Sequence, residues 1–228
     1  MEVLHNGFTL ELSSGAFPLS TDSIALSGFV RLPKNAKVLD LGSGCGTLGL
    51  LLCAKDASCE VTGVELDQAA HEMALHNAKA NNVSCRLTSI CENISNIPHF
   101  IQSGAMTTVV SNPPYFSGGP AAKLTLARRD DLCSMDTLMK NAAWALQFGG
   151  DFFVVHRPER LAELFACAAK YKLEPKRLQL LRHTEAGPVS LVLVQCRKGA
   201  KPGLVWEEEF LYDQDGNSSL YRNHLYHL

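Results

Sequence analysis

The chain has 228 residues, of which 46% are hydrophobic and 19% are charged, and its formal net charge is −2 at pH 7. These values are typical of a globular protein and exclude a disordered or membrane-embedded chain, and the longest apolar run, Leu48–Ala54, is too short to span a bilayer. The net charge gives no overall attraction for nucleic acid but leaves room for a local basic surface.

The N-terminal stretch "MEVLHNGFTLELSSG" carries an acid and alternating apolar residues, which is unlike a signal peptide. None of the eight cysteines has a partner at the short spacing of zinc sites or redox motifs. We therefore expect a cytoplasmic protein with reduced cysteines, no metal site and no membrane segment. No feature of the sequence indicates an obligate protein partner.

Residues 7–12 predict a short strand, and the segment "LSTDSIALSGFV" at 19–30 predicts a capped helix before the first core strand. From there, short β-branched or apolar runs alternate with helical patterns. The runs that predict strands are 38–41, 61–64, 86–90, 107–111 and 152–155, and the helical patterns are 67–81 and 135–147. Asp67 and Ser134 are predicted N-caps, and Gly149–Gly150 is a predicted helix stop.

Two later runs, 177–181 and 190–196, predict strands joined directly by the turn "HTEAGP", and hence an antiparallel hairpin at one sheet edge. The whole pattern predicts an α/β fold: a Rossmann-like, doubly wound, mostly parallel seven-stranded sheet with an antiparallel edge hairpin. No repeat or linker divides the chain, so we predict a single domain over 1–228. Within it, 1–35 would be an N-terminal, substrate-side extension, and 36–228 the core that carries the functional loops.

A glycine-rich loop follows the first core strand and opens a helix. Residues 44–49 match the G-x-G-x-x-G pattern of dinucleotide sites, but Asp40, two residues before Gly42, would repel a pyrophosphate. A ligand with a cationic or zwitterionic end, such as S-adenosylmethionine, suits the loop better. Glu65 ends the next strand, 21 residues after Gly44, which is the usual place for an acid that accepts hydrogen bonds from ribose hydroxyls.

The stretch "SICENISN" follows the third core strand, where a cofactor adenine would lie. Asn93 in this stretch is equally consistent with an adenine contact and with an ordinary turn or cap. The predicted cofactor contacts are Asp40, Gly42, Ser43, Gly44, Gly46, Glu65, Leu66, Asn93, Ile94 and Asn112.

The sequence "SNPPYF" falls at the end of the fourth core strand, so its groups should face the same crevice as the glycine loop. An exocyclic adenine amine is a poor nucleophile, because its lone pair is delocalised into the ring. The side-chain oxygen of Asn112 and the carbonyl of Pro113 can each accept one amino hydrogen, while the rigid Pro114 and a stacking ring at Tyr115 hold the geometry. These four residues are the predicted catalytic motif.

The chain as a whole resembles the class I S-adenosylmethionine-dependent methyltransferases, and most closely the bacterial tRNA(Val) adenine-37 N6-methyltransferases. The resemblance rests on "FPLSTDSIALSGF", "DLGSGCGTLGLLL", "GVELDQAAHEMALHNAKAN", "SNPPYF", "LARRDDLCSMDTLMKNAAWAL" and "GGDFFVVHRPERL". It implies that Asp40 and the glycines hold the methionine part of the cofactor, Glu65 the ribose, and the Asn-Pro-Pro-Tyr motif the target adenine. The implied substrate contacts are Thr21, Asp22, Phe116, Arg128 and Arg129, where Arg129 replaces the His of some relatives.

The resemblance implies a tRNA substrate, in which the target base must turn out of its stack to reach the motif. Two alternatives remain. A protein-glutamine N5-methyltransferase shares the Asn-Pro-Pro-Tyr motif, but that family usually has an N-terminal helical domain, and only about 35 residues precede the first core strand here. A non-catalytic RNA- or dinucleotide-binding module would not need Asp40, Glu65 and the motif. Basic clusters at 128–129, 170–182 and 197–201 predict either RNA contacts or solvated surface charge.

Overall fold

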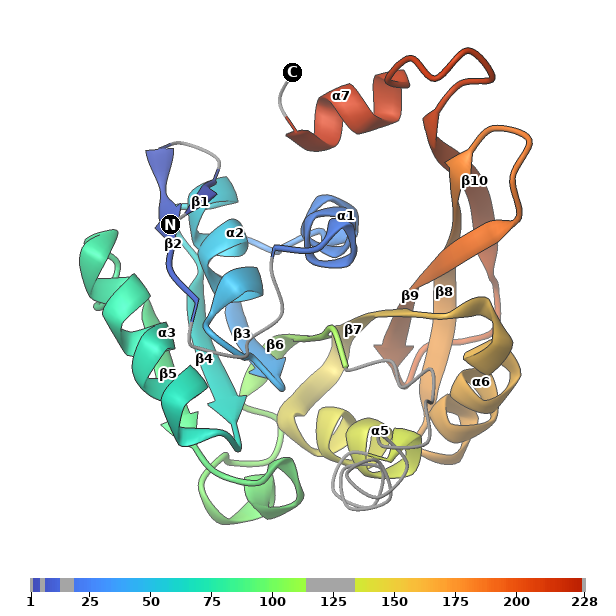
Figure 1. The fold of residues 1–228 in the computed structure, drawn as a ribbon. Coiled ribbons are helices and arrows are strands. Elements are labelled where there is room, and N and C mark those ends of the chain that lie inside the picture. Colours follow the sequence, from blue (N-terminus) through green and yellow to red (C-terminus); the bar gives the residue numbers. More distant parts are fainter. Residues whose placement is uncertain (1, 5–6, 13–18, 114–133, 227–228) are drawn as a thin grey trace, which may run out of the picture.

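The protein is represented by a computed structural model that describes residues 2–4, 7–12, 19–113 and 134–226. Its centre is an eight-stranded sheet with the order β10-β8-β9-β7-β6-β3-β4-β5 (Figure 1). The strands are β3 (Lys37–Leu41), β4 (Glu60–Glu65), β5 (Leu87–Cys91), β6 (Met106–Ser111), β7 (Leu146–His156), β8 (Leu173–Thr184), β9 (Val189–Lys198) and β10 (Val205–Tyr212). β1 (Glu2–Val3) and β2 (Thr9–Leu10) form a separate antiparallel pair.

Strands β5, β4, β3, β6 and β7 pair in parallel, and β9 is antiparallel to both β7 and β8. This arrangement confirms the predicted α/β class with a mostly parallel, doubly wound sheet. The sheet has one strand more than predicted, because β10 pairs in parallel with β8 outside the hairpin and becomes the edge. Sequence reasoning missed β10 because its first half lies exposed on both faces and shows no buried alternation.

Helices cover both faces of the sheet. One face carries α1 (Thr21–Phe29), α2 (Thr47–Lys55), α3 (Gln68–Ala80) and α7 (Leu220–Tyr226), and the other carries η2 (Ile94–His99), α5 (Met135–Ala145) and α6 (Leu161–Lys170), with η3 (Pro158–Arg160) just before α6. Neighbouring residues of one strand serve the two cores: Phe153 packs with α1 and α2, and Phe152 with α5 and α6. Figure 1 shows α5 and α6 together on the side away from α1.

The predicted caps are confirmed. Asp67 accepts a hydrogen bond from the Ala70 N–H and Ser134 from the Thr137 N–H, so α3 and α5 begin where their sequences indicate.

The predicted helix stop at Gly149–Gly150 is wrong, because α5 ends at Ala145 and both glycines lie inside β7. They serve the strand instead: Gly149 has φ of 77°, and a Cβ on Gly150 would lie 2.9 Å from the Thr107 carbonyl oxygen. The close approach of β7 to β6 at this register shift therefore requires glycine.

The seven cysteines among the described residues are free, and four of them are buried, as expected for reduced core thiols. Within residues 2–4, 7–12, 19–113 and 134–226, no helix is both long enough and apolar enough to cross a membrane. The predicted domain boundaries stay a prediction.

Candidate functional site

The candidate site lies where β3, β4 and β6 end side by side. β3 is hydrogen-bonded to β4 on one side and to β6 on the other, so the chain order reverses at this point. In open α/β sheets such a switch point opens a crevice beyond the carboxyl ends of the strands. The sheet brings Asp40, Glu65 and Asn112 to this edge from three strands, as the sequence predicts.

The glycine loop has an open side. Gly42 and Gly44 adopt φ of 74° and 54°, and a Cβ built on either would meet no atom within 4 Å. The other side of the loop is tied down, since the Gly42 and Ser43 N–H groups both donate to the Val64 carbonyl at 2.9 and 3.1 Å. Gly46, at the N-cap of α2, packs against Ala74 of α3. The loop is therefore fixed on the side that faces β4 and can admit a ligand on the open side of Gly42 and Gly44.

Glu65 joins the loop to the end of β4. Its Oε2 accepts a hydrogen bond from the Gly44 N–H at 2.8 Å, and its Oε1 accepts one from the Asp67 N–H at 2.9 Å. A carboxylate oxygen has two lone pairs, so each oxygen of Glu65 can still accept a hydrogen bond from a hydroxyl group. The predicted ribose role is compatible with this geometry and stays a prediction.

Asp40 is the buried acid of the site, with 2% of its surface exposed. Burial, and secondarily the charge of Glu65, raises its pKa to about 7. Its Oδ2 and the Oγ of Ser43 make no hydrogen bond with any described residue. Buried polar atoms without partners are rare. The Ser43 Oγ lies against Gly63 of β4, the residue that pairs with Asp40 of β3. A cationic ammonium group would satisfy both, so the residues fit the methionine end of S-adenosylmethionine.

The other three predicted cofactor residues have different surroundings. Asn93 caps η2, with its Oδ1 accepting a hydrogen bond from the Ser95 N–H at 2.8 Å, which is the cap role that the sequence left open. Ile94 is 7% exposed and packs in the core beside α5, whereas Leu66 is 52% exposed at the end of β4. Their contacts with a cofactor adenine stay predictions.

Asn112 is held by a residue that the sequence analysis missed. Its Nδ2 donates a hydrogen bond to the Oγ of Ser23 at 2.9 Å, and Ser23 lies buried in the first turn of α1 with 7% exposure. The Nδ2 end of the amide therefore faces Ser23. The sequence offered one indication of this contact: Ser23 stands next to the predicted substrate residues Thr21 and Asp22, on the helix predicted before the core.

The remaining predicted site residues divide into two groups. Thr21 begins α1, with its Oγ1 3.4 Å from the Tyr226 hydroxyl of α7, and Asp22 follows in the same turn. Pro113 is buried directly after Asn112. Pro114, Tyr115, Phe116, Arg128 and Arg129 lie outside the described residues.

The comparisons with known proteins agree with this geometry. A family model described as "methyltransferase small domain" matches residues 23–166. The chain belongs to the methyltransferase small domain family. Two relatives carry the name tRNA1(Val) (adenine(37)-N6)-methyltransferase. That of Photobacterium profundum is 29% identical over 88% of this chain and 86% of its own length, and that of Bacteroides fragilis is 30% identical over 79% and 76%. The resemblance found in the sequence is confirmed.

Solved structures confirm the methyltransferase fold. A predicted O-methyltransferase from Agrobacterium tumefaciens aligns with a TM-score of 0.77 at 18% identity, covering 91% of this chain and 96% of that one. The T. thermophilus 16S rRNA N2 G1207 methyltransferase, solved in complex with AdoMet and guanosine, aligns with a TM-score of 0.58 at 22% identity, covering 82% and 45%.

A second missed residue, Asn77 of α3, ties this methyltransferase's glycine loop to its N-terminal segment. The amide is 1% exposed; its Nδ2 donates to the carbonyls of Cys45 and Glu11 at 2.9 and 2.8 Å, and its Oδ1 accepts from the Glu11 N–H at 2.9 Å. Its signal was visible, because Asn77 stands on the apolar stripe formed by Ala70, Ala74 and Ala78. A polar residue on such a stripe indicates a specific buried partner.

Four of the eight described basic residues in the predicted clusters have acidic partners. The ion pairs are Lys170–Asp136, Arg177–Glu207, Arg182–Glu208 and Arg197–Asp151. The Lys198 ammonium donates to the Leu146 carbonyl at 2.7 Å. The solvated-charge interpretation therefore fits several cluster members better than RNA contact does.

Proposed function

We propose that the protein transfers a methyl group from S-adenosylmethionine to the N6 amine of an adenine in tRNA, and that this adenine is position 37 of a valine tRNA. The substrate follows the names of the relatives. The observation that carries the chemistry is the Asn112 amide, held by the buried Ser23 hydroxyl beside the glycine loop. A reaction on tRNA also places the protein in the cytoplasm.

When bound, S-adenosylmethionine supplies a methyl group on a sulfonium centre. Asp40 and Ser43 would hold its ammonium end, since both have a buried atom without a hydrogen-bond partner among the described residues. Glu65, with both oxygens already fixed by backbone N–H groups, would accept the ribose hydroxyls. The donor end is therefore oriented by groups that are in place before the substrate arrives.

On the substrate side, the chain's own residues align the amine. Ser23 holds the Nδ2 end of the Asn112 amide, so the Oδ1 end can accept one amino hydrogen, and the Pro113 carbonyl can accept the second. Two accepted hydrogen bonds favour a pyramidal nitrogen, whose lone pair then points at the methyl donor. Because the work is alignment, no strong general base is required at the start.

The test is methylation of defined substrates. The purified protein is incubated with S-adenosylmethionine and an unmodified valine tRNA transcript, and nucleosides are identified by mass spectrometry. We expect N6-methyladenosine in the adenine-37 transcript, none when guanine replaces that adenine, and none with the Asn112→Ala variant. Methylation of a release-factor glutamine instead of tRNA would favour the glutamine alternative, and the absence of product from both substrates would reject the proposal.

A further inference from the structure

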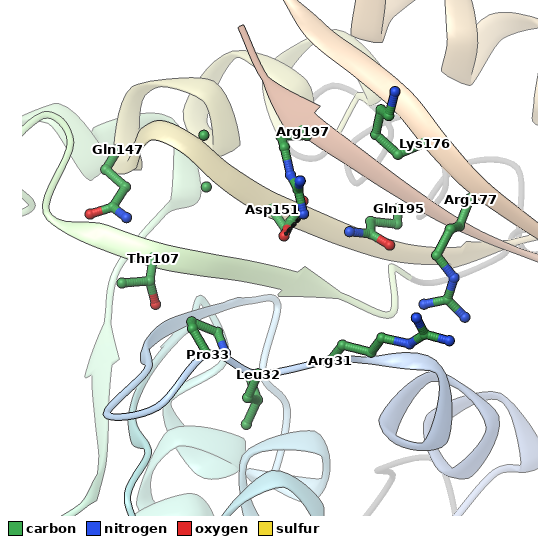
Figure 2. Close-up of a pocket in the computed structure, with 12 residues that line it drawn as sticks. Arg31, Leu32, Pro33, Thr107, Gln147, Asp151, Lys176, Arg177, Gln195 and Arg197 are labelled. Carbon is green, nitrogen blue, oxygen red and sulfur yellow. Dashed lines mark hydrogen bonds and ion pairs between the residues drawn. The ribbon is translucent and has the colours of Figure 1, made fainter. Parts of the chain in front are cut away.

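A cavity of about 550 Å³ opens at the edge of the sheet opposite the candidate active site. It lies among the amino-terminal parts of β6, β7 and β8, the carboxyl end of β9 and the segment just before β3 (Figure 2). Five residues along β6 separate Thr107 in its wall from Asn112, which corresponds to about 16 Å. The cavity is large enough for a small ligand and is distinct from the glycine-loop crevice.

The lining of this cavity is strongly basic. It contains the side chains of Arg31, Lys176, Arg177 and Arg197 but only one carboxylate, Asp151. That carboxylate is already engaged, since both of its oxygens accept hydrogen bonds from Arg197 at 2.9 Å. The remaining cations are therefore in excess over the acids that face them.

Two of the cations have no acidic partner within the described residues. Arg31 makes no hydrogen bond or ion pair there, and Lys176 donates only to the Lys201 carbonyl at 3.1 Å. Arg177 bonds Glu207 and the Phe29 carbonyl. Burial lowers the pKa of Arg177, and the nearby charge of Arg31 lowers it further. Arg31 and Arg177 therefore lie close enough to repel each other, and Glu207 balances only the charge of Arg177.

Gln195 adds an independent sign of a ligand. Its side chain is 5% exposed, and its Oε1 makes no hydrogen bond with any described residue. Figure 2 shows its amide between Asp151 and Arg177, within the basic lining. A buried amide without a partner is costly, and rotation of the amide would present either its acceptor or its donor to a ligand.

We propose that this cavity is a binding site for phosphate groups, separate from the active site. Arg31 and Lys176 supply the charge that phosphate requires, with Arg177 and Gln195 as further donors. The phosphate can belong to a free nucleotide or to the backbone of bound tRNA. The second source rests on the proposed function, and the first does not.

The test uses Arg31→Ala, Lys176→Ala, the double variant, and Lys79→Ala as control. Lys79 is an exposed cation on α3, far from the cavity, so it removes the same charge without touching the site. Arg31→Lys keeps the charge and should restore binding. All variants are compared by thermal melting first, and we expect unchanged midpoints because neither Arg31 nor Lys176 supports an acidic partner.

Two probes distinguish the sources of phosphate. Calorimetry with pyrophosphate should show binding to the wild type, weakened at least ~10-fold in the double variant, if the ligand is a free nucleotide. If the source is tRNA, filter binding should show weaker affinity and a salt slope smaller by about one for each cation removed. Loss of methylation is not the readout, so failure here is distinguishable from failure of the proposed function. The proposal is overturned if neither probe separates the double variant from the wild type, or if Lys79→Ala has the same effect.

Discussion

Ser23 and Asn112 are 89 residues apart in the sequence and meet through one hydrogen bond of 2.9 Å. We therefore propose Ser23 as a positioning residue that acts through the Asn112 amide. Removal of its hydroxyl allows the amide to rotate away from the orientation in which its oxygen faces the amine. The consequence should appear in the chemical step and not in cofactor binding.

We therefore predict that Ser23→Ala lowers the single-turnover methylation rate by roughly 10- to 100-fold, with unchanged S-adenosylmethionine affinity. Ser23→Thr, which keeps a hydroxyl, should recover most of the rate. In the double variant with Asn112→Ala, the loss should be no greater than in Asn112→Ala alone, because the two residues act as one unit. Fully additive losses would show that Ser23 acts by another route.

The raised pKa of Asp40 predicts how the stability of the ligand-free protein depends on pH. The pKa of Asp40 is about 7 in the folded chain against 3.8 for an unperturbed carboxyl, because it is buried and lies near Glu65. The folded state thus binds the proton more tightly than the unfolded state. This contribution to stability is fully present below pH 3.8 and is lost as the pH rises to about 7, with a total of roughly 4 kcal/mol.

Asp40→Asn should remove that pH dependence. Urea unfolding at pH 5, 6, 7 and 8 measures it, and we expect the variant to gain stability relative to the wild type as the pH increases. The same titration should affect ligand binding: wild-type affinity for S-adenosylmethionine should increase from pH 6 to pH 8 as the carboxylate forms, and the variant should bind weakly at every pH. Parallel stability profiles for the two proteins would contradict the raised pKa.

On the scale of elements, α3 connects the glycine loop to the N-terminal segment. Asn77 contacts both Glu11 and the Cys45 carbonyl. Among the described residues, the side chain of Asn81, one turn later, bonds to the backbone of Thr9 and to the Asn77 carbonyl but not to the glycine loop. The two asparagines make the same kind of contact with the N-terminal segment and differ in their access to the loop. They form a matched pair.

We predict that Asn77→Ala lowers the free energy of unfolding by roughly 2–4 kcal/mol, because it leaves the buried Cys45 carbonyl and the part-buried backbone groups of Glu11 without these hydrogen bonds. It should also weaken S-adenosylmethionine binding, since the loop loses its anchor. Asn81→Ala should cost less stability and leave cofactor affinity unchanged. Calorimetry and denaturant titration of both variants check this, and equal effects on affinity would mean that the Cys45 contact does not position the loop.

The elements also show what the sequence could reveal. The caps at Asp67 and Ser134 and the strands that carry Asp40 and Glu65 were predictable, because each depends on a local pattern of a few residues. β10 was not, since the first half of the strand is exposed and pairs with β8 through backbone bonds and cross-strand ion pairs such as Arg182–Glu208, and only its second half, with Leu211, reaches the core. The Ser23–Asn112 contact was equally inaccessible, because no local rule joins residues so far apart in the chain. The prediction of a helix stop at Gly149–Gly150 was wrong because glycine is typical both of helix ends and of places where two strands approach closely.

On the scale of the whole molecule, acidic and basic groups gather at opposite ends of the sheet's parallel strands. Asp40 and Glu65 lie at the carboxyl ends, and the basic cavity lies at the amino-terminal ends; we call these two sides the edges of the sheet. The carboxyl edge carries the candidate active site. β9 runs antiparallel to β7, so its carboxyl end, followed by Lys201, lies at the opposite edge with the basic cavity. Under the proposed function, an anticodon stem-loop bound at the candidate active site would cover only the first edge, whereas the body of a full tRNA could extend toward the second.

The last prediction separates these edges by salt dependence. Arg128 follows the predicted catalytic motif closely in the sequence, so Arg128→Ala and Arg129→Ala should each reduce the slope of log affinity against log salt by about one unit, for the stem-loop and the full tRNA alike. Lys201→Ala should reduce the slope for full tRNA alone. Lys79→Ala is the control, because Lys79 is an exposed cation on α3, which packs against β4 and β5, and no change of slope is expected. Lys198 is avoided, since its bond to the Leu146 carbonyl would confound binding with stability. Filter binding of both RNAs across a salt series measures all four slopes, and a Lys201 effect that persists with the stem-loop would mean that the RNA reaches that edge by another path.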